Sequence, residues 1–452
     1  MTAAPPVDDL IHRLMSRPKT GDGVGLHRME RLLAPALAGD WGRRLDAIKV
    51  TGSNGKGSVA RLTAGLLEAL GQECGLFTSP HLLRFNERIE CAGQAISDDD
   101  LCAAVARFQA AENDLLRAWP DEQVGAFEAF TAVAMDWFST RRPAALVLEA
   151  GVGGRYDATR AIPGNVAALT SVDLEHADIL GDRLELIAYD KADLCPDGGT
   201  LVLGRLAPDL RRRLDAYARL RRLQLVTWED VGSVRRLQLD SDGMRADLDL
   251  FGEPLDDVRF SLLGEHQIVN ALTAAGLARA WLNRQGMDVN AAAFAAAFRC
   301  AVGNARWPGR LERISDDPPV YIDVGHTPEA MSSTLAALPH LAAGRKVLLV
   351  CGVSYNKNAE GVVAALAPAA DRLVCTRAHH RGGDSTRVAN AAKALRPDLP
   401  MRIEDDLEKA VQSAVREARR DGMLVLVAGG LFLAIEAAAI LKGDDAKALR
   451  FF

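Results

Sequence analysis

A glycine-rich run carries the residue types that bind phosphate groups. It reads Val-Thr-Gly-Ser-Asn-Gly-Lys-Gly-Ser and spans residues 50–58. Glycines let backbone N–H groups converge on an anion, while the N-terminus of a following helix and Lys56 both add positive charge. Ser58 is placed to bind the Mg²⁺ that accompanies a nucleotide. The run therefore predicts a binding site for ATP or a close relative.

The flanking residues supply the elements that such a loop needs. Apolar residues 45–50 indicate a strand and residues 59–70 a helix. In the common phosphate loop the hydroxyl residue follows the lysine directly, whereas here Gly57 intervenes. A purely structural strand–helix turn is the alternative. We favour the phosphate loop because the lysine, the serine and both flanking elements occur together.

Two further polar segments follow predicted buried strands at residues 144–149 and 166–170. Glu149 ends the first strand and is followed by glycines, and His176 lies just past the second. Side chains at the carboxyl ends of parallel strands face the crevice where open α/β sheets bind ligands. His176 alone would be an ordinary hydrogen-bonded loop histidine. With the phosphate loop beside it, we expect Glu149, His176 and Ser58 to meet at one metal.

Composition limits the classes of protein to consider. The chain has 452 residues, 48% hydrophobic and 25% charged, which is typical of a soluble globular protein with two or three domains. Its net charge of −6 argues against nucleic acid as the main partner. The arginine-rich run at residues 210–222 has helical spacing and is interpreted as a solvated helix face rather than a nucleic-acid site.

Cysteines and apolar runs indicate the compartment. Seven cysteines are scattered without a Cys-x-x-Cys pair, which favours reduced thiols in a cytoplasm over disulfides or a zinc site. The first ten residues lack the basic and apolar regions of a signal peptide. No run of 18 apolar residues appears, so we expect no membrane span.

Strand-like and helix-like segments alternate after the phosphate loop, which predicts an α/β domain with a parallel sheet. Glycines and prolines cluster at residues 300–320, and beyond them the alternation restarts as a second, smaller doubly wound domain. We place the boundary so that residues 1–302 form the ATP-binding domain and residues 303–452 the second. Residues 205–260 are less regular and remain unassigned.

At this point the sequence resembles the folylpolyglutamate synthase / dihydrofolate synthase family of the Mur ligase superfamily. The resemblance covers residues 20–440, and the order and spacing of its segments make it specific. The segments are Thr51–Ser58, Phe77–Leu82, Asn86–Ile89, Glu149–Thr159, Leu174–His176, Leu180–Asp182, Gly264–Gln267 with Asn270, Pro308–Glu312 and Asp323–His326.

The resemblance implies a central P-loop-containing α/β domain with a parallel sheet, followed by a Rossmann-like C-terminal α/β domain. It implies an ATP-dependent ligase that joins glutamate to a pterin-type carboxylate through an acyl phosphate, acting as a cytoplasmic monomer. Residues matching nucleotide contacts are Asn54, Gly55, Lys56, Gly57, Ser58, Asn270 at the adenine, Arg310 at the phosphates and Asp323 at the ribose.

The same resemblance implies two Mg²⁺ ions. Residues matching the metal ligands are Ser79, Glu149 and His176, with Ser58 beside the nucleotide's own metal. Lys191 falls where the family carries a carbamylated lysine that supports the second ion, although an exposed helix lysine is the alternative. His326 matches a residue near the incoming amino acid. Lys56, Lys191 and His326 are therefore the expected catalytic residues.

Departures from the family pattern lie in the segments that would contact the substrates. They are residues 23–28, 125–128, 326–328, 356–358 and 429–430. They leave open a non-folate acid, such as a cell-wall precursor or a specialised metabolite, or a different amino acid. An inactive nucleotide-binding protein is a further alternative. The segment His379–Arg381 with Asp384 is either a polar loop at the domain interface or a substrate contact, and we favour the loop.

Overall fold

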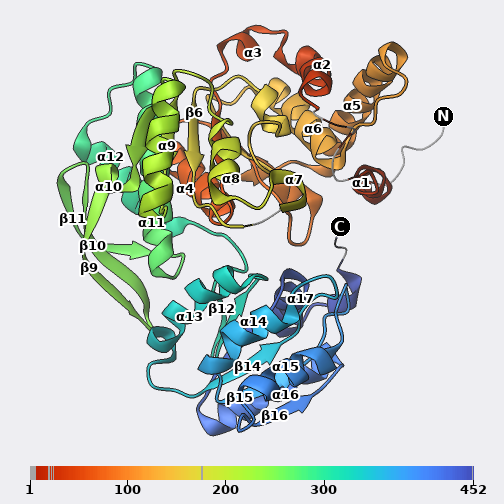
Figure 1. Ribbon diagram of the computed structural model, residues 1–452, viewed down its shortest axis with the longest axis vertical. Coiled ribbons are helices and arrows are strands. Elements are labelled where there is room, and N and C mark those ends of the chain that lie inside the picture. The colour runs from red at the N-terminus through yellow and green to blue at the C-terminus, as the bar shows by residue number, and fades with distance from the viewer. Residues whose placement is uncertain are drawn as a thin grey trace.

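The computed structural model describes residues 7–18, 21, 23, 25–174, 177–449 and 451, without the side chains of 177, 178, 328 and 329. Within these residues the chain forms two α/β domains, which are stacked along the long axis of the molecule in Figure 1. The linker between them follows helix α12 (Ala291–Asn304) and leads to strand β12 (Glu312–Asp316).

The first domain is built on an eight-stranded sheet. In spatial order its strands are β4 (Gln94–Ala95), β3 (Ile89–Cys91), β2 (Cys74–Phe77), β5 (Ala145–Glu149), β1 (Ile48–Thr51), β6 (Val166–Leu169), β7 (Thr200–Leu203) and β8 (Gln224–Thr227). The six strands from β2 to β8 run parallel, and β3 and β4 are antiparallel additions. Every position of β1, β5 and β6 is buried, which explains the uninterrupted hydrophobicity of residues 145–148 in β5 and 166–169 in β6. Their carboxyl ends meet at one edge.

Helices cover both faces of this sheet, and their apolar sides pack on it. On one face α4 (Lys56–Ala69), α11 (Glu265–Arg284) and α12 pack on Ile48 and Val50. On the other face α2 (Leu26–Leu37), α5 (Asp98–Ala118) and α6 (Ala126–Arg141) pack on Leu146 and Leu148. The remaining helices are α1 (Val7–Met15), α3 (Asp40–Arg44), α7 (Ala177–Leu180), α8 (Leu184–Ala192), α9 (Pro208–Leu220), α10 (Trp228–Val231), η1 (Phe85–Arg88) and η2 (Ala158–Ala161).

The stretch left unassigned from sequence contains a three-stranded antiparallel sheet. It is made of β9 (Gly232–Asp240), β10 (Gly243–Leu250) and β11 (Glu253–Phe260), with β10 in the middle. Burial alternates along β10, and its inner residues join the core formed by α11 and α12. The arginine-rich run lies on α9, where most of its arginines face solvent, which confirms the solvated helix.

The second domain is a smaller doubly wound unit, as predicted. Its strands, in spatial order, are β12, β13 (Pro319–Asp323), β17 (Leu424–Ala428), β14 (Val347–Cys351), β15 (Arg372–Cys375) and β16 (Met401–Ile403), all parallel except β12. Helices α13 (Pro328–Ala342), α14 (Ala359–Leu366) and α15 (Ser385–Leu395) cover one face. Helices α16 (Leu407–Asp421) and α17 (Leu431–Lys442) cover the other, and η3 (Ala367–Ala369) and η4 (Ala446–Ala448) complete the domain.

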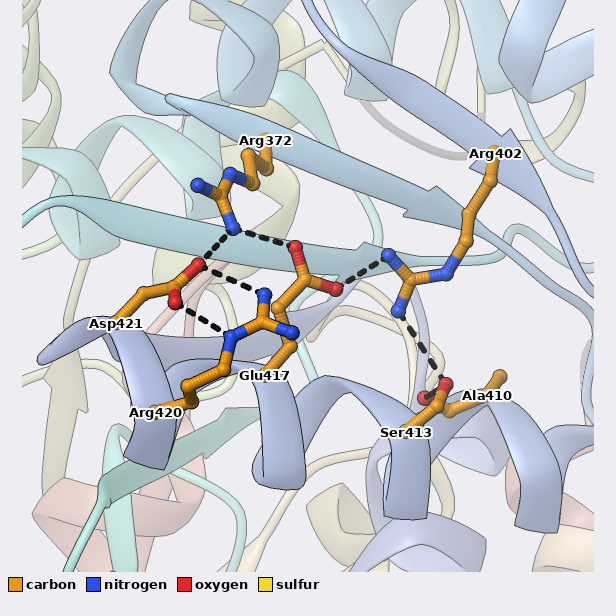
Figure 2. Close-up of polar contacts among 7 residues, drawn as sticks. All are labelled: Arg372, Arg402, Ala410, Ser413, Glu417, Arg420 and Asp421. Carbon is orange, nitrogen blue, oxygen red and sulfur yellow. Dashed lines mark hydrogen bonds and ion pairs between the residues drawn. The ribbon is translucent and has the colours of Figure 1, made fainter.

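An ion-pair network fixes α16 on the edge of this sheet (Figure 2). Glu417 accepts hydrogen bonds from Arg372 of β15 at 2.7 Å and from Arg402 of β16 at 2.5 Å. Asp421 at the end of the helix pairs with Arg372 and Arg420. Each carboxylate thus has two guanidinium partners, and the network ties the helix to β15 and to the edge strand β16.

Three sequence expectations concern the whole chain. No helix in the described ranges is long and apolar enough to cross a bilayer. All seven cysteines are free thiols, as expected for reduced side chains. The proposed boundary after residue 302 falls in the last turn of α12 and stays a prediction.

Candidate active site

The glycine-rich run forms a tight turn between β1 and α4. Gly52 and Gly55 have φ values of +146° and +86°, which favour glycine. A Cβ atom on Gly55 would lie 2.8 Å from the Asn270 side-chain oxygen, so no larger residue fits without displacing that side chain. The N-terminal N–H groups of α4 therefore open onto the space beside Asn270.

Polar contacts hold this loop against the end of β6. The Asn54 N–H donates to Ser171 Oγ at 2.9 Å, and the Asn54 side-chain amide donates to Asp173 at 2.8 Å. The Asp173 N–H in turn donates to Ser53 Oγ at 2.9 Å. Lys56 folds over the loop and donates to the Gly52 and Ser53 carbonyls at 2.8 and 3.1 Å. Its ammonium group thus lies where a bound phosphate would need positive charge.

Gly57, the residue that separates the lysine from the serine, has a packing role. A Cβ atom at this position would lie 2.5 Å from the indole ring of Trp307, which comes from the linker between the domains. The Arg61 guanidinium lies 5.4 Å from the centre of the same ring. The glycine is therefore needed for the linker to rest on the first turn of α4, and sequence reasoning had assigned Trp307 no role.

Glu149 ends β5 as a buried carboxylate and accepts a hydrogen bond from the Ser79 N–H at 2.9 Å. Burial raises the pKa of Glu149, and the nearby charges of Lys56, Arg310 and Arg88 oppose that rise. Three cations thus act on the Glu149 carboxylate: Lys56 of the loop, Arg310 of the second domain and Arg88, which is buried in η1.

Arg88 is a site residue to which sequence reasoning gave no role, although its segment was noted. It is 5% exposed, and its Nε donates to His81 Nδ1 at 2.7 Å. Its guanidinium lies 5.0 Å from the ring centre of Phe130. Burial lowers the pKa of Arg88 to about 10, and burial beside Arg88 lowers the pKa of His81 to about 3. His81 is therefore a neutral acceptor, and Arg88 brings a fixed positive charge close to Glu149.

A narrow cleft of about 100 Å³ separates the phosphate loop from the second domain. Asp323 lies on its far wall and accepts hydrogen bonds from the Leu311 and Gly325 N–H groups at 3.0 and 2.7 Å. Burial raises the pKa of Asp323, and Arg310 opposes the shift. The predicted residues that line this cleft together are Asn54, Gly55, Gly57, Ser58, Asn270, Arg310 and Asp323.

The remaining predicted residues lie at different depths. Ser79 presents its backbone to Glu149, as described. Lys191 is 1% exposed in α8, and its carbonyl packs against the backbone of Gly154, so it is not the exposed helix lysine considered as an alternative. His326 is exposed in the loop between β13 and α13. His176 lies outside the described residues.

A second cavity, of about 900 Å³, opens at the same edge of the sheet beyond Glu149. We call it the large cavity. Phe127, Tyr156 and Tyr189 supply aromatic surface to its wall, and Arg381 reaches it from the second domain. Glu128 also lies on this wall; it accepts the Gly125 N–H at 2.8 Å and pairs with buried Arg28 at 3.0 Å. The cavity size and lining suit a flat organic molecule.

The oxygen donors beside the phosphate loop fit a magnesium ion. Ser58 is buried in the first turn of α4, and Glu149 is a buried carboxylate at the same sheet edge. Such oxygen ligands are those that Mg²⁺ prefers. No group of three or more metal-binding side chains lies together in the part of the chain that the structure describes. Much of the coordination shell would then come from water and nucleotide phosphates, as is usual for Mg²⁺.

Comparisons with known proteins agree on one family. Residues 309–431 match the family model described as "Mur ligase, glutamate ligase domain". A folylpolyglutamate synthase of Lacticaseibacillus casei is 33% identical over 348 residues, which cover 77% of this chain and 79% of that protein. A probable bifunctional folylpolyglutamate synthase/dihydropteroate synthase of Halobacterium salinarum is 33% identical over 395 residues, and this chain spans only 46% of its length.

A solved structure of Mycobacterium tuberculosis folylpolyglutamate synthase complexed with ADP superimposes with a TM-score of 0.86 at 29% identity. The match covers 97% of this chain and 99% of that one.

Proposed function

The chain belongs to the folylpolyglutamate synthase / dihydrofolate synthase family of ATP-dependent ligases, and we propose that it joins glutamate to a dihydropteroate- or folate-type carboxylate, releasing ADP and phosphate. The observation that carries the proposal is the electrostatic influence of Lys56 and Arg310 on buried Glu149, at a sheet edge that borders both a phosphate loop and a large cavity.

ATP enters the cleft with its phosphates on the N-terminus of α4. Lys56 exchanges its contacts with the Gly52 and Ser53 carbonyls for phosphate oxygens. Asn270 contacts the adenine, Arg310 the phosphates and Asp323 the ribose. Bound Mg²⁺, held by Ser58, Ser79, Glu149 and His176, would neutralise phosphate charge and hold the nucleotide oxygens.

An amine cannot displace oxide from the substrate carboxylate, because oxide is a poor leaving group. The reaction therefore begins with activation of that carboxylate. One carboxylate oxygen bonds to the γ-phosphorus as the bond to the β-phosphate oxygen breaks, which gives an acyl phosphate and ADP. Lys56 and Arg310 neutralise the charge on the transferring phosphoryl group. The glutamate amine then bonds to the acyl carbon, phosphate leaves with the former C–O electron pair, and the amine loses a proton.

The acid occupies the large cavity with its ring system among Phe127, Tyr156 and Tyr189. The Thr51 hydroxyl donates to the Gly153 carbonyl at 2.6 Å, so the strand that leads into the phosphate loop also supports the wall of this cavity. The two substrates can therefore be aligned across one sheet edge, which supplies much of the rate gain in such reactions.

Finer assignments follow from the family pattern. We propose that Lys191 is carbamylated and supports a second Mg²⁺, and that His326 contacts the incoming amino acid. The burial of Lys191 supports its role because carbamylation would convert a buried side chain into an oxygen ligand. The protein is proposed to be a cytoplasmic monomer.

A phosphate-release screen tests the function. The full chain, ATP and Mg²⁺ are incubated with glutamate and either dihydropteroate or tetrahydrofolate. We expect ADP and phosphate only when acid and amino acid are both present, and we expect Lys56→Ala to lower the rate by at least about 1,000-fold with an unchanged melting temperature. Lys393→Ala, on the exposed side of α15, is the matched control. Turnover with other acids, but with neither dihydropteroate nor tetrahydrofolate, would overturn the assignment.

A further inference from the structure

One turn of the second domain crosses to the large cavity. Residues 379–382 follow β15, and Arg381 joins Phe127 and Tyr156 in lining that cavity. His380, its neighbour, lines a separate cavity together with residues of α1 in the first domain. The sequence had left this segment as either an interface loop or a substrate contact, and its position makes it both a contact with the first domain and part of the cavity wall.

Arg381 differs from the other cations in the wall of the large cavity. Arg17 pairs with Glu112, and Arg155 pairs with Asp193 at 2.6 Å. Arg381 has no carboxylate partner among the described residues, and its guanidinium lies 5.8 Å from the ring centre of Phe432. Within the described part of the chain, Arg381 is therefore the cation of the cavity wall that remains available to bind an anion.

The acidic residues in the wall are already engaged. Asp157 accepts N–H groups from Gly151, Val152 and Thr159, between 2.8 and 3.1 Å. Asp190 accepts the Gly154 N–H at 2.9 Å, and Glu128 pairs with Arg28 as described. Rotation of these side chains toward Arg381 would sacrifice loop contacts, so an anion for Arg381 comes from outside the described residues of this wall.

A buried carboxylate holds the turn that presents Arg381. Glu436, 0% exposed in α17, accepts the His379 and His380 N–H groups at 2.6 and 2.9 Å. The Tyr355 N–H donates to the Arg381 carbonyl at 3.2 Å. Arg381 itself has a φ of +50°, which an L-residue adopts only where the surroundings hold it. Burying a carboxylate is costly, so this one has a definite task in fixing the turn.

We propose that Arg381 binds a carboxylate of the acid substrate that is not consumed in the reaction, and that Glu436 is the residue that positions it. The inference rests on the proposed function. A folate-type acid carries a glutamyl tail with two carboxylates, one to be activated and one to spare, whereas the single carboxylate of dihydropteroate is the reacting one. Arg381 would therefore favour acids that already bear a glutamyl residue, which are the substrates for repeated addition.

Steady-state kinetics with both acids test this assignment. In Arg381→Ala we expect the KM for tetrahydrofolate to rise about 10- to 100-fold, the range for loss of a charge-assisted contact, with kcat nearly unchanged. The KM values for dihydropteroate, ATP and glutamate should change less than about twofold. Arg381→Lys keeps the charge without the planar fork and should fall between wild type and alanine. Arg377→Ala, which removes a cation paired with Asp405 outside the large cavity, is the matched control and should match wild type.

The outcomes separate this inference from the proposed function. No ADP formation by wild type with either acid overturns both. Turnover with dihydropteroate alone leaves the function standing and overturns the role of Arg381, as does an equal rise in both acid KM values. A rise confined to the KM for glutamate would assign Arg381 to the incoming amino acid instead and also overturn the proposal.

The positioning role of Glu436 is tested by comparing the KM values for the same two acids. In assays at pH 8, where the Glu436 carboxyl group is ionised and both of its oxygens accept N–H groups, Glu436→Gln keeps the shape of the side chain but offers one carbonyl oxygen to two backbone donors. We expect the tetrahydrofolate KM to rise about 3- to 10-fold, smaller than for Arg381→Ala and in the same direction, with the dihydropteroate KM unchanged. Glu417→Gln, which removes a carboxylate paired with Arg372 and Arg402 in the network of Figure 2, should leave both values unchanged. A uniform loss with both acids in Glu436→Gln would mean a structural role only.

Discussion

Gly57 lies in a crowded backbone position of the phosphate loop. Its neighbour across the domain boundary is an indole ring, and even one methyl group would lie 2.5 Å from that ring. Trp307 also faces Arg61 of the same helix. The ring is therefore held from two sides and can yield only by moving the linker.

Gly57→Ala should lower the free energy of unfolding by about 1–3 kcal/mol, the usual cost of overpacking, and should weaken ATP binding because the loop must shift. Gly65→Ala is the matched control in the same helix. Its new methyl group would lie 3.9 Å from the Ala301 Cβ atom, so stability should rise by about 0.5–1 kcal/mol. Thermal unfolding and the KM for ATP check both variants. The double change Gly57→Ala with Trp307→Ala should recover ATP affinity, and continued weak binding would contradict the proposed clash.

Site residues within a recognisable run could be predicted from the sequence. Lys56 and Glu149 each follow or end an apolar strand next to glycines, and such local patterns specify where a side chain projects. Trp307 and Glu436 could not be predicted because their roles depend on contacts with residues distant in the chain, and the sequence left the segment of Arg381 as either an interface loop or a substrate contact for the same reason. The one available signal for Glu436 was a lone carboxylate within the apolar helix Leu431–Lys442.

At the scale of elements, α17 is unusual because it buries this carboxylate without a charged partner. Only backbone N–H groups of the adjoining turn contact it among the described residues. Burial raises the pKa of Glu436 from 4.5 to about 7, and the two hydrogen bonds only partly oppose the shift. The folded domain therefore holds a proton there at a pH where the unfolded chain has released it.

This difference predicts a pH dependence of stability. Because the pKa is higher in the folded state, the contribution of Glu436 is fully present below the unfolded pKa of 4.5 and is lost as the pH rises toward 7. The free energy of unfolding should fall by about 2 kcal/mol from this group between about pH 5 and pH 8. Urea unfolding of the full chain at both pH values checks the slope.

Glu436→Gln should remove that part of the slope, and Glu417→Gln is the control. The pKa of Glu417 is lowered because Arg372 and Arg402 together outweigh its burial, so its stabilising effect is lost only as the pH falls below the unfolded value. Equal slopes in wild type and Glu436→Gln would show that the carboxyl group is ionised in the folded protein throughout.

The parallel strands could be predicted because full burial produces uninterrupted apolar runs, as in β5 and β14. The sheet of β9–β11 could not, because one of its faces is exposed. Arginine and aspartate alternate with apolar residues there, and Arg245 pairs with Asp257 across the strands at 2.7 Å. Such sequences resemble solvated loops unless their pairing is known.

For the whole molecule, the cleft between the domains is small for its proposed ligand. About 100 Å³ separates the phosphate loop from Asp323, whereas small-molecule sites commonly enclose about 300–1,000 Å³. We therefore expect the second domain to turn away about the linker when ATP enters and then to close over it. Closure would also keep water from the acyl phosphate.

Hydrogen exchange of the full chain can follow this movement. We expect ATP with Mg²⁺ to change amide exchange in the phosphate loop and in residues 305–311 together, because both border the cleft and Trp307 contacts Gly57. Strand β16, at the outer edge of the sheet in the second domain, should serve as an internal control for a strand away from the cleft. A change in the phosphate loop with none in the linker would contradict a hinge at this position.

The contact between Trp307 and Gly57 also has an evolutionary consequence. Position 57 tolerates only hydrogen as a side chain while an indole ring occupies position 307. A descendant could acquire a hydroxyl residue directly after the lysine, as in commoner loops, only after its linker had lost the large ring. Among related sequences these two sites should therefore change as a pair, even though some 250 residues separate them in the chain.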